Sequence, residues 1–317
     1  MDKLQTNLGL VLRGMAMGIA EVIPGVSGGT IAFITGIYER LIDAIKTVLG
    51  PELIRSWRSG GFRQTWRTIQ GSFLLFLLMG MALGVVVGVL VVTHLLETYP
   101  VLLWAFFFGL IVASAIYIGR QVGTWGMIQI FGLLLAAVAA YWITVATPSQ
   151  GTGALWFVFV SGMIAISALI LPGISGSFIL LLLGMYTLII PAIKDILETQ
   201  RTESLITLGV FGLGCLLGLA TFSRLLSWTF KRYHDTTMAV LTGFMIGSLN
   251  KIWPWRNVLV YRTDSSGEEV PFLERSVWPG AFEGDPMIGG AVVLMGVGFL
   301  LVFALDRIQV PKTISHG

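Results

Sequence analysis

The chain has 317 residues, of which 55% are hydrophobic and 12% are charged, whereas a soluble domain normally carries about a quarter charged residues. This composition excludes an ordinary soluble enzyme and predicts a polytopic membrane protein. The single cysteine excludes an internal disulfide, and the three scattered histidines show no metal-ligand spacing, so we expect neither a metal nor a cofactor. The formal net charge of +3 reflects Lys and Arg near the ends of apolar segments, which indicates membrane orientation and not nucleic-acid binding.

Two apolar segments near the N-terminus, residues 8–23 and 30–48, are each interrupted by charged residues. Neither is a clean membrane span, which needs about 20 apolar residues. Because Pro24 and Gly25 separate them, we expect a re-entrant hairpin of two helices whose broken backbone is surrounded by protein or water. Segments 155–171 and 178–193 predict a second hairpin of the same kind. The sequence leaves open whether the arms of each hairpin stop halfway or span the membrane.

Six further segments are apolar enough to be ordinary spans, at 72–96, 101–118, 127–146, 205–230, 237–249 and 287–305. The predicted fold is an all-α polytopic membrane protein in which each half holds a re-entrant helical hairpin and three transmembrane helices. We treat residues 1–317 as a single membrane domain with halves at about 1–150 and 151–317. Within 51–70, arginines alternate with aromatic residues, which indicates either an interfacial segment on an anionic leaflet or a plain cytoplasmic loop.

The two halves are related by an internal repeat. The sequence PGVSGG at 24–29 matches PGISGS at 172–177 with an offset of 148, and the match continues through Tyr38 and Tyr186. The later spans match with an offset of 134. Because three crossings per half is an odd number, we expect the two halves to have opposite orientations in the membrane. Inverted repeats whose broken helices meet near the midplane are typical of secondary transporters.

The distribution of basic residues predicts the orientation. With the N-terminus inside, 14 of the 20 Lys and Arg residues fall in inside segments and 6 fall outside, as the positive-inside rule requires. Both termini are then cytoplasmic, and the loop 251–285 lies outside. We expect the tryptophans of this loop to rest at the membrane interface.

Each motif combines a helix-breaking Pro-Gly pair with hydroxyls and glycines inside an apolar region. A helix that begins at this depth presents unpaired N–H groups and the positive end of its dipole, which suit phosphate or another oxyanion. The alternative is that the hydroxyls only satisfy the freed carbonyls of a kinked helix. Because the motif occurs twice, we favour a binding site formed by Ser27, Gly28, Gly29, Thr30, Ser175, Gly176 and Ser177.

Glu21 has no counterpart in the second half, where Leu169 takes its position. A carboxylate in an apolar segment is a functional hypothesis by default. Burial and a bound phosphate would both favour its protonated form, which would let Glu21 carry a proton in exchange with the anion. The alternative is that Glu21 caps the next helix or pairs with an arginine. Arg13 is either a counter-ion for the phosphate or a side chain that extends toward the inner surface.

The segment EVIPGVSGGT at 21–30, followed by Gly36 and Tyr38, resembles the signature of the bacterial polyprenyl-phosphate transporter family, formerly a domain of unknown function. The resemblance covers nearly the whole chain. It implies a flippase, not an enzyme, that returns undecaprenyl phosphate from the outer to the inner leaflet of the bacterial cytoplasmic membrane for cell-wall biogenesis. The two motifs and Glu21 would bind the head group while the lipid tail stays in the bilayer. The implied partners are this lipid and the membrane lipids. The sequence leaves open whether the protein forms a homo-oligomer.

Two other functions share part of this pattern. The membrane phosphatase that acts on undecaprenyl pyrophosphate has similar motifs, but this chain has Gly176 where that family has an arginine, and no histidine follows Ser27. Because a phosphatase needs a nucleophile, an acid or base and a cation, we favour transport over hydrolysis. A secondary transporter of a small soluble anion would use the same motifs along a sealed aqueous path, without a cleft open sideways to lipid.

Overall fold

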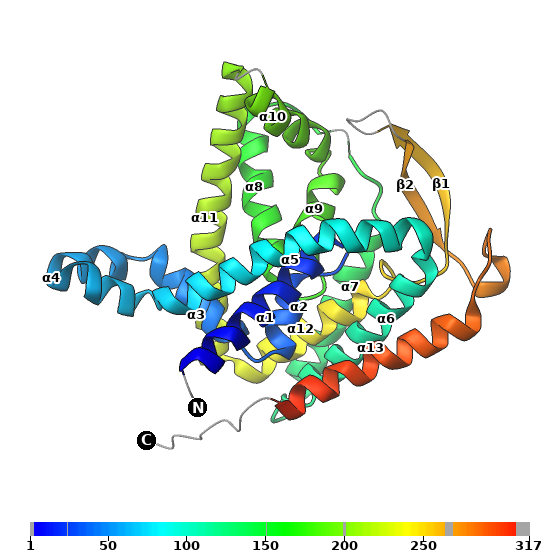
Figure 1. Cartoon of the computed structure of the whole chain (residues 1–317), viewed down its shortest axis with the longest axis horizontal. Coiled ribbons are helices and arrows are strands. Elements are labelled where there is room, and N and C mark those ends of the chain that lie inside the picture. Colours follow the sequence, from blue (N-terminus) through cyan, green and yellow to red (C-terminus); the bar gives the residue numbers. More distant parts are fainter. Residues whose placement is uncertain (1–2, 24, 150, 199–200, 264–268, 309–317) are drawn as a thin grey trace.

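The computed structural model describes residues 3–23, 25–149, 151–198, 201–263 and 269–308, so Pro24 of the first motif lies outside the described part. This part is mostly helical (Figure 1). Its helices that are long and apolar enough to cross a membrane are α5 (Gly71–Thr98), α6 (Pro100–Gly119), α7 (Met127–Val145), α11 (Thr202–Arg232) and α13 (Ile288–Ile308). The prediction of a polytopic helical membrane protein is confirmed. The remaining predicted span, at 237–249, corresponds to the shorter helix α12 (His234–Ser248), whose 15 residues extend about 22 Å.

The second arm of each predicted hairpin consists of two helices, not one. The first hairpin is formed by α1 (Lys3–Val22), α2 (Gly28–Ile34) and α3 (Tyr38–Val48), and the second by α8 (Leu155–Ile170), α9 (Gly176–Leu182) and α10 (Tyr186–Glu198). The breaks fall at Gly36 and Gly184, whose φ angles of 71° and 68° favour glycine. Between α9 and α10 the axis bends by 115°. These glycines occupy matching positions of the repeat, so both halves turn at the same place.

Glycines allow the backbone of α1 to contact the backbone of α5, and that of α8 to contact that of α11. A Cβ added at Gly14 would lie 2.1 Å from the carbonyl oxygen of Leu77, and one at Gly84 would lie 2.1 Å from that of Met15. In the second half, the position that matches Gly84 is Gly218, and a Cβ there would lie 2.7 Å from backbone atoms of Met163. Small residues of this kind allow membrane helices to pack closely. The same contacts therefore recur in both halves, as the sequence repeat predicts.

The last helix of each half packs against the other half. Helix α7 lies along α12, and α13 lies along α6. A Cβ at Gly109 on α6 would lie 2.0 Å from the carbonyl oxygen of Met295 on α13, and one at Gly243 on α12 would lie 2.2 Å from that of Leu133 on α7. Through this exchange, each half contacts the other along a pair of helices.

The segment predicted to lie outside contains an antiparallel hairpin of β1 (Arg256–Thr263) and β2 (Glu269–Ser276), which the all-α prediction did not include. It lies across the molecule from the start of α1 and the end of α13 (Figure 1). The tryptophans of this segment differ in environment, since Trp255 is buried in a small apolar cluster with Ala291 while Trp278 is exposed.

The segment 51–70 is helical and not a plain loop. Helix α4 (Pro51–Thr68) is kinked at Gly60 and Gly61 and projects from the rest of the molecule (Figure 1). Trp57 and Phe62 on this helix are exposed, as an interfacial segment would require.

The packing of α1 on α5 predicts a sharp difference between two substitutions on one helix. Gly14→Ala should lower the unfolding midpoint of the purified protein, because its Cβ meets the backbone of α5, and overpacking of this kind costs about 1–3 kcal/mol. Gly9→Ala is the control, because a Cβ there meets nothing within 4 Å, and it should leave the midpoint unchanged or slightly raised. Equal midpoints for the two variants in a thermal unfolding assay in detergent would contradict this packing.

Candidate anion site at the paired motifs

The two motifs meet in the structure. The hydroxyl of Ser27 lies 3.2 Å and 3.1 Å from the carbonyl oxygens of Leu169 and Leu171, at the end of α8. From the other side, the N–H of Gly173 donates to the hydroxyl of Thr30 at 3.1 Å. Ser27 and Thr30 are fully buried. The first motif is therefore joined to the second through hydrogen bonds between residues more than 140 positions apart.

Two further features tighten this junction. The hydroxyl of Tyr38, at the start of α3, donates to the carbonyl of Ile170 at 3.2 Å. A Cβ at Gly29 would lie 2.5 Å from the same carbonyl oxygen, so a side chain at this position would push the motifs apart. The freed carbonyls at the end of α8 are thus satisfied by side chains of the first hairpin, as buried backbone groups must be.

The first turn of α2 is capped from within the chain. The N–H of Gly28 donates to Oε1 of Glu21 at 2.7 Å, and the N–H of Gly29 donates to Oγ of Ser27 at 3.1 Å. Both roles that sequence analysis left as alternatives, a helix cap for Glu21 and carbonyl satisfaction for Ser27, are present in this conformation. The donors expected to face an anion are held by the protein's own oxygen atoms.

The second motif differs at the same place. Ser175 precedes α9 but makes no side-chain hydrogen bond to cap that helix, and its Oγ lies 2.8 Å from Oγ of Ser177. Ser175 is buried while Ser177 is exposed. Leu169, which stands in place of Glu21, contacts the Gly176 position with apolar atoms. The start of α9 therefore lacks the carboxylate cap found at α2.

Arg13 is not brought to the paired motifs. It precedes Glu21 by eight residues on α1, which corresponds to about 12 Å along the helix axis. It lies within electrostatic range of Arg40, whose side chain donates to Oε1 of Gln70 and lies 4.2 Å from the ring centroid of Phe73. This position fits a side chain that extends toward the face where α3 and α5 begin.

Sequence analysis missed Lys251, which approaches both motifs. A Cβ at Gly25 would lie 3.0 Å from Cγ of Lys251, and the Nζ of Lys251 lies 4.4 Å from the ring centroid of Phe178 in α9. The available signal was weak, because Lys251 follows an apolar helix and such lysines usually mark a membrane boundary. The internal repeat offered a better indication, because the position equivalent to Lys251 in the first half is Tyr117, so the lysine is a departure from the repeat.

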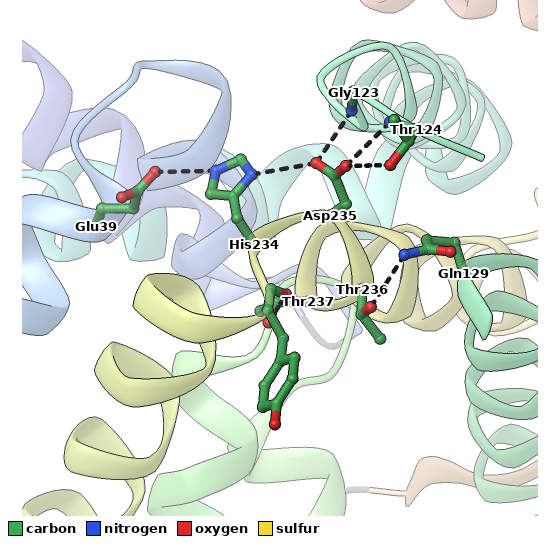
Figure 2. A network of polar contacts seen from close by, with 9 residues as sticks. Glu39, Gly123, Thr124, Gln129, His234, Asp235, Thr236 and Thr237 are labelled. Carbon is green, nitrogen blue, oxygen red and sulfur yellow. Dashed lines mark hydrogen bonds and ion pairs between the residues drawn. The ribbon is translucent and has the colours of Figure 1, made fainter. Parts of the chain in front are cut away.

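A separate polar network joins the halves on another face (Figure 2). His234 lies between two carboxylates, with Nε2 3.8 Å from Oε1 of Glu39 and Nδ1 3.6 Å from Oδ1 of Asp235. Asp235 also accepts hydrogen bonds from the N–H groups of Gly123 and Thr124 at 3.1 Å and 3.0 Å. The network connects α3, the start of α12 and the loop after α6. It is partly exposed.

Comparison with known proteins gives a consistent result. The sequence model of a family described as undecaprenyl phosphate translocase-like matches residues 17–270. A protein of Vibrio cholerae serotype O1 named polyprenyl-phosphate transporter is 44% identical over 309 residues, which cover 96% of this chain and 98% of that protein. A Staphylococcus aureus protein of the same name is 29% identical over 257 residues, which cover 77% of this chain and 85% of that protein. No solved structure matches the chain.

These matches confirm the family suggested by the first motif, and the names of the family and its members indicate a transporter and not an enzyme. The matched region includes Glu21, both motifs and Lys251. The chain belongs to the undecaprenyl phosphate translocase-like family.

Proposed function

We propose that this chain moves undecaprenyl phosphate from the outer to the inner leaflet of the bacterial cytoplasmic membrane, with the phosphate held at the paired motifs. The observation that carries the proposal is the direct contact between the motifs, in which Ser27 and Thr30 bond to backbone groups around Leu171 and Gly173. Backbone donors and hydroxyls from two broken helices then converge at one place. The names of the relatives supply the class of substrate.

In this proposal Glu21 is the internal competitor of the phosphate. Its carboxylate accepts the hydrogen bond from Gly28 N–H that an oxyanion would otherwise take. Protonation would remove the charge from Glu21 and weaken this bond, because hydrogen bonds to an ionised acceptor are about twice as strong as neutral ones. The N–H of Gly28 would then be free for the phosphate. Proton uptake and binding of the anion would thereby be coupled.

The conformation in which the motifs contact each other would be the closed state of the transport cycle. A head group that passes between two halves of opposite orientation requires Ser27 and Thr30 to exchange their protein partners for phosphate oxygens. Each exchanged hydrogen bond contributes only about 0.5–1.5 kcal/mol, so opening is energetically accessible. The arrangement of the halves as inverted repeats about this junction is part of the proposal.

The lipid tail would follow the apolar surface beside the motifs. A groove of about 450 Å³ lies between α8 and α11 and is lined mainly by apolar side chains and glycines. One of its lining residues, Ile166, is about one turn before Leu169, where Ser27 bonds to α8. A tail in this groove would keep its hydrocarbon surface away from water. A small soluble anion has no tail to place there, so the groove would favour the lipid as substrate.

Transport, hydrolysis and soluble-anion uptake can be separated in proteoliposomes that carry labelled undecaprenyl phosphate in one leaflet. We expect the purified protein to accelerate exchange of the label between leaflets without releasing inorganic phosphate. Undecaprenol, which has the tail but no charge, is the control and should not exchange faster than in empty liposomes. Release of inorganic phosphate from undecaprenyl pyrophosphate in a parallel sample would support the phosphatase. Uptake of free phosphate without lipid exchange would support the soluble-anion transporter.

Two variants of Glu21 separate its capping role from its proton role. Glu21→Gln keeps an oxygen that can accept from Gly28 N–H but cannot titrate, so we expect stable protein with at least tenfold slower lipid exchange and a flat pH profile. Glu21→Ala removes both roles and should also lower the unfolding midpoint. If Glu21→Gln exchanged lipid at the normal rate with the normal pH profile, Glu21 would have no role in coupling.

If the hydroxyls of the motifs bind the phosphate, their removal should lower the affinity of the protein for the lipid phosphate. Ser27→Ala and Ser175→Ala should each weaken binding about tenfold, which corresponds to about 1.4 kcal/mol for a lost hydrogen bond. Ser114→Ala is the matched control, because Ser114 is equally buried and its hydroxyl donates to the carbonyl of Leu110 in its own helix. Binding can be measured by titration of the purified protein with the lipid in detergent. Unchanged affinity in both motif variants would assign the hydroxyls to packing alone.

A further inference from the structure

A cationic side chain is inserted where the two motifs come together. Lys251 lies in the turn after α12, and its side chain is only 15% exposed. Its Cγ packs against the Gly25 corner of the first hairpin, and its ammonium group lies over the ring of Phe178, 4.4 Å from the centroid. Phe178 follows Ser177 directly in the first turn of α9. Lys251 thus contacts both hairpins and projects to the helix start that has no carboxylate cap.

The backbone of Lys251 is held in place by its neighbours. Its N–H donates to the carbonyl of Ser248 at 2.9 Å, and its carbonyl accepts from Nη1 of Arg256 at 2.8 Å. Arg256 also forms an ion pair with Glu274 on β2, and Oε2 of Glu274 lies 3.8 Å from Nζ of Lys251. The β-hairpin therefore positions two cations and one carboxylate beside the motifs.

The charges of this group do not balance. Lys251 and Arg256 carry two positive charges, and Glu274 is the acidic side chain with ion pairs to both in the described residues. Burial and then the charge of Arg256 lower the pKa of Lys251 to about 8, while Glu274 opposes the shift. A buried cation that lacks full compensation attracts an anion, because an oxyanion would supply the missing charge and hydrogen bonds. The aromatic ring of Phe178 supplies only a weaker substitute.

Resting on the function proposed above, we propose that Lys251 binds the phosphate monoester of the lipid as it enters the paired motifs from the face on which the β-hairpin lies. A phosphate oxygen pairs with the ammonium group in place of the ring of Phe178, and the phosphate competes with Glu274 for this cation. A zwitterionic or neutral head group lacks the net negative charge that this site compensates, so Lys251 also contributes to selection of the phosphorylated lipid. The nearby hydroxyls of Ser175 and Ser177 supply neutral donors for the same head group.

The test measures binding of farnesyl phosphate, a short-chain analogue, to the purified full-length protein in detergent. Lys251→Met keeps the length of the side chain without its charge, and we expect at least tenfold weaker binding. Lys251→Arg restores the charge and should regain most of the affinity. Lys231→Met is the control, because Lys231 is 64% exposed and pairs with Asp43, and it should bind normally. A thermal unfolding midpoint for each variant separates loss of binding from loss of fold.

Several outcomes would overturn the assignment. Equal affinity of Lys251→Met and the wild type, with wild-type lipid exchange intact, would remove Lys251 from recognition while the proposed function stands. Weak binding in Lys251→Arg as well as Lys251→Met, with lowered midpoints in both, would make Lys251 a structural residue. Inorganic phosphate that displaces farnesyl phosphate with equal affinity would reassign the site to the free ion. A wild-type protein that neither binds the analogue nor exchanges lipid would reject the proposed function itself.

Discussion

The structure depends on how two broken helices satisfy their backbone groups away from water. A helix that ends in a buried position, as α8 does at Ile170, leaves carbonyls without partners, and each unsatisfied buried group costs about 1–3 kcal/mol. Here the hydroxyls of Ser27 and Tyr38 reach these carbonyls from the other hairpin, while Thr30 accepts the N–H of Gly173. In the proposed function, the same groups bind the phosphate. The atoms that satisfy the backbone of the broken helices are then also the atoms that exchange their protein partners for the ligand.

The close approach of the helices is what brings these groups into reach. Glycines on α1 and α5, and their counterparts on α8 and α11, place backbones in direct contact, while α7 and α13 each pack on the opposite half. A scaffold fixed in this way leaves little room for independent motion within one half. The hydrogen bonds between the motifs and the polar network around His234 (Figure 2) add to the α7–α12 and α13–α6 contacts that join the halves, so opening of the motifs requires these hydrogen bonds to break.

The internal repeat made much of this arrangement predictable. The offset of 148 residues predicts that the two motifs have the same local structure, and the matching glycines at Gly36 and Gly184 turn the chain in the same way. The turn itself was not predicted, because a single glycine in an apolar segment is also compatible with a continuous helix. The β-hairpin and the burial of Lys251 were not predictable either, because they depend on contacts between segments far apart in the chain, which periodicity does not reveal.

The departures from symmetry fall on residues of the proposed site. Glu21 stands where the second half has Leu169, and Lys251 stands where the first half has Tyr117. Both charged residues contact the first motif, since Glu21 accepts from the N–H of Gly28 and the side chain of Lys251 packs on Gly25. The carboxylate occupies a donor at the start of α2, while the ammonium group lies over Phe178 at the start of α9. In the proposed cycle, protonation of Glu21 frees the N–H of Gly28 at the first motif, while Lys251 supplies a cation beside the second.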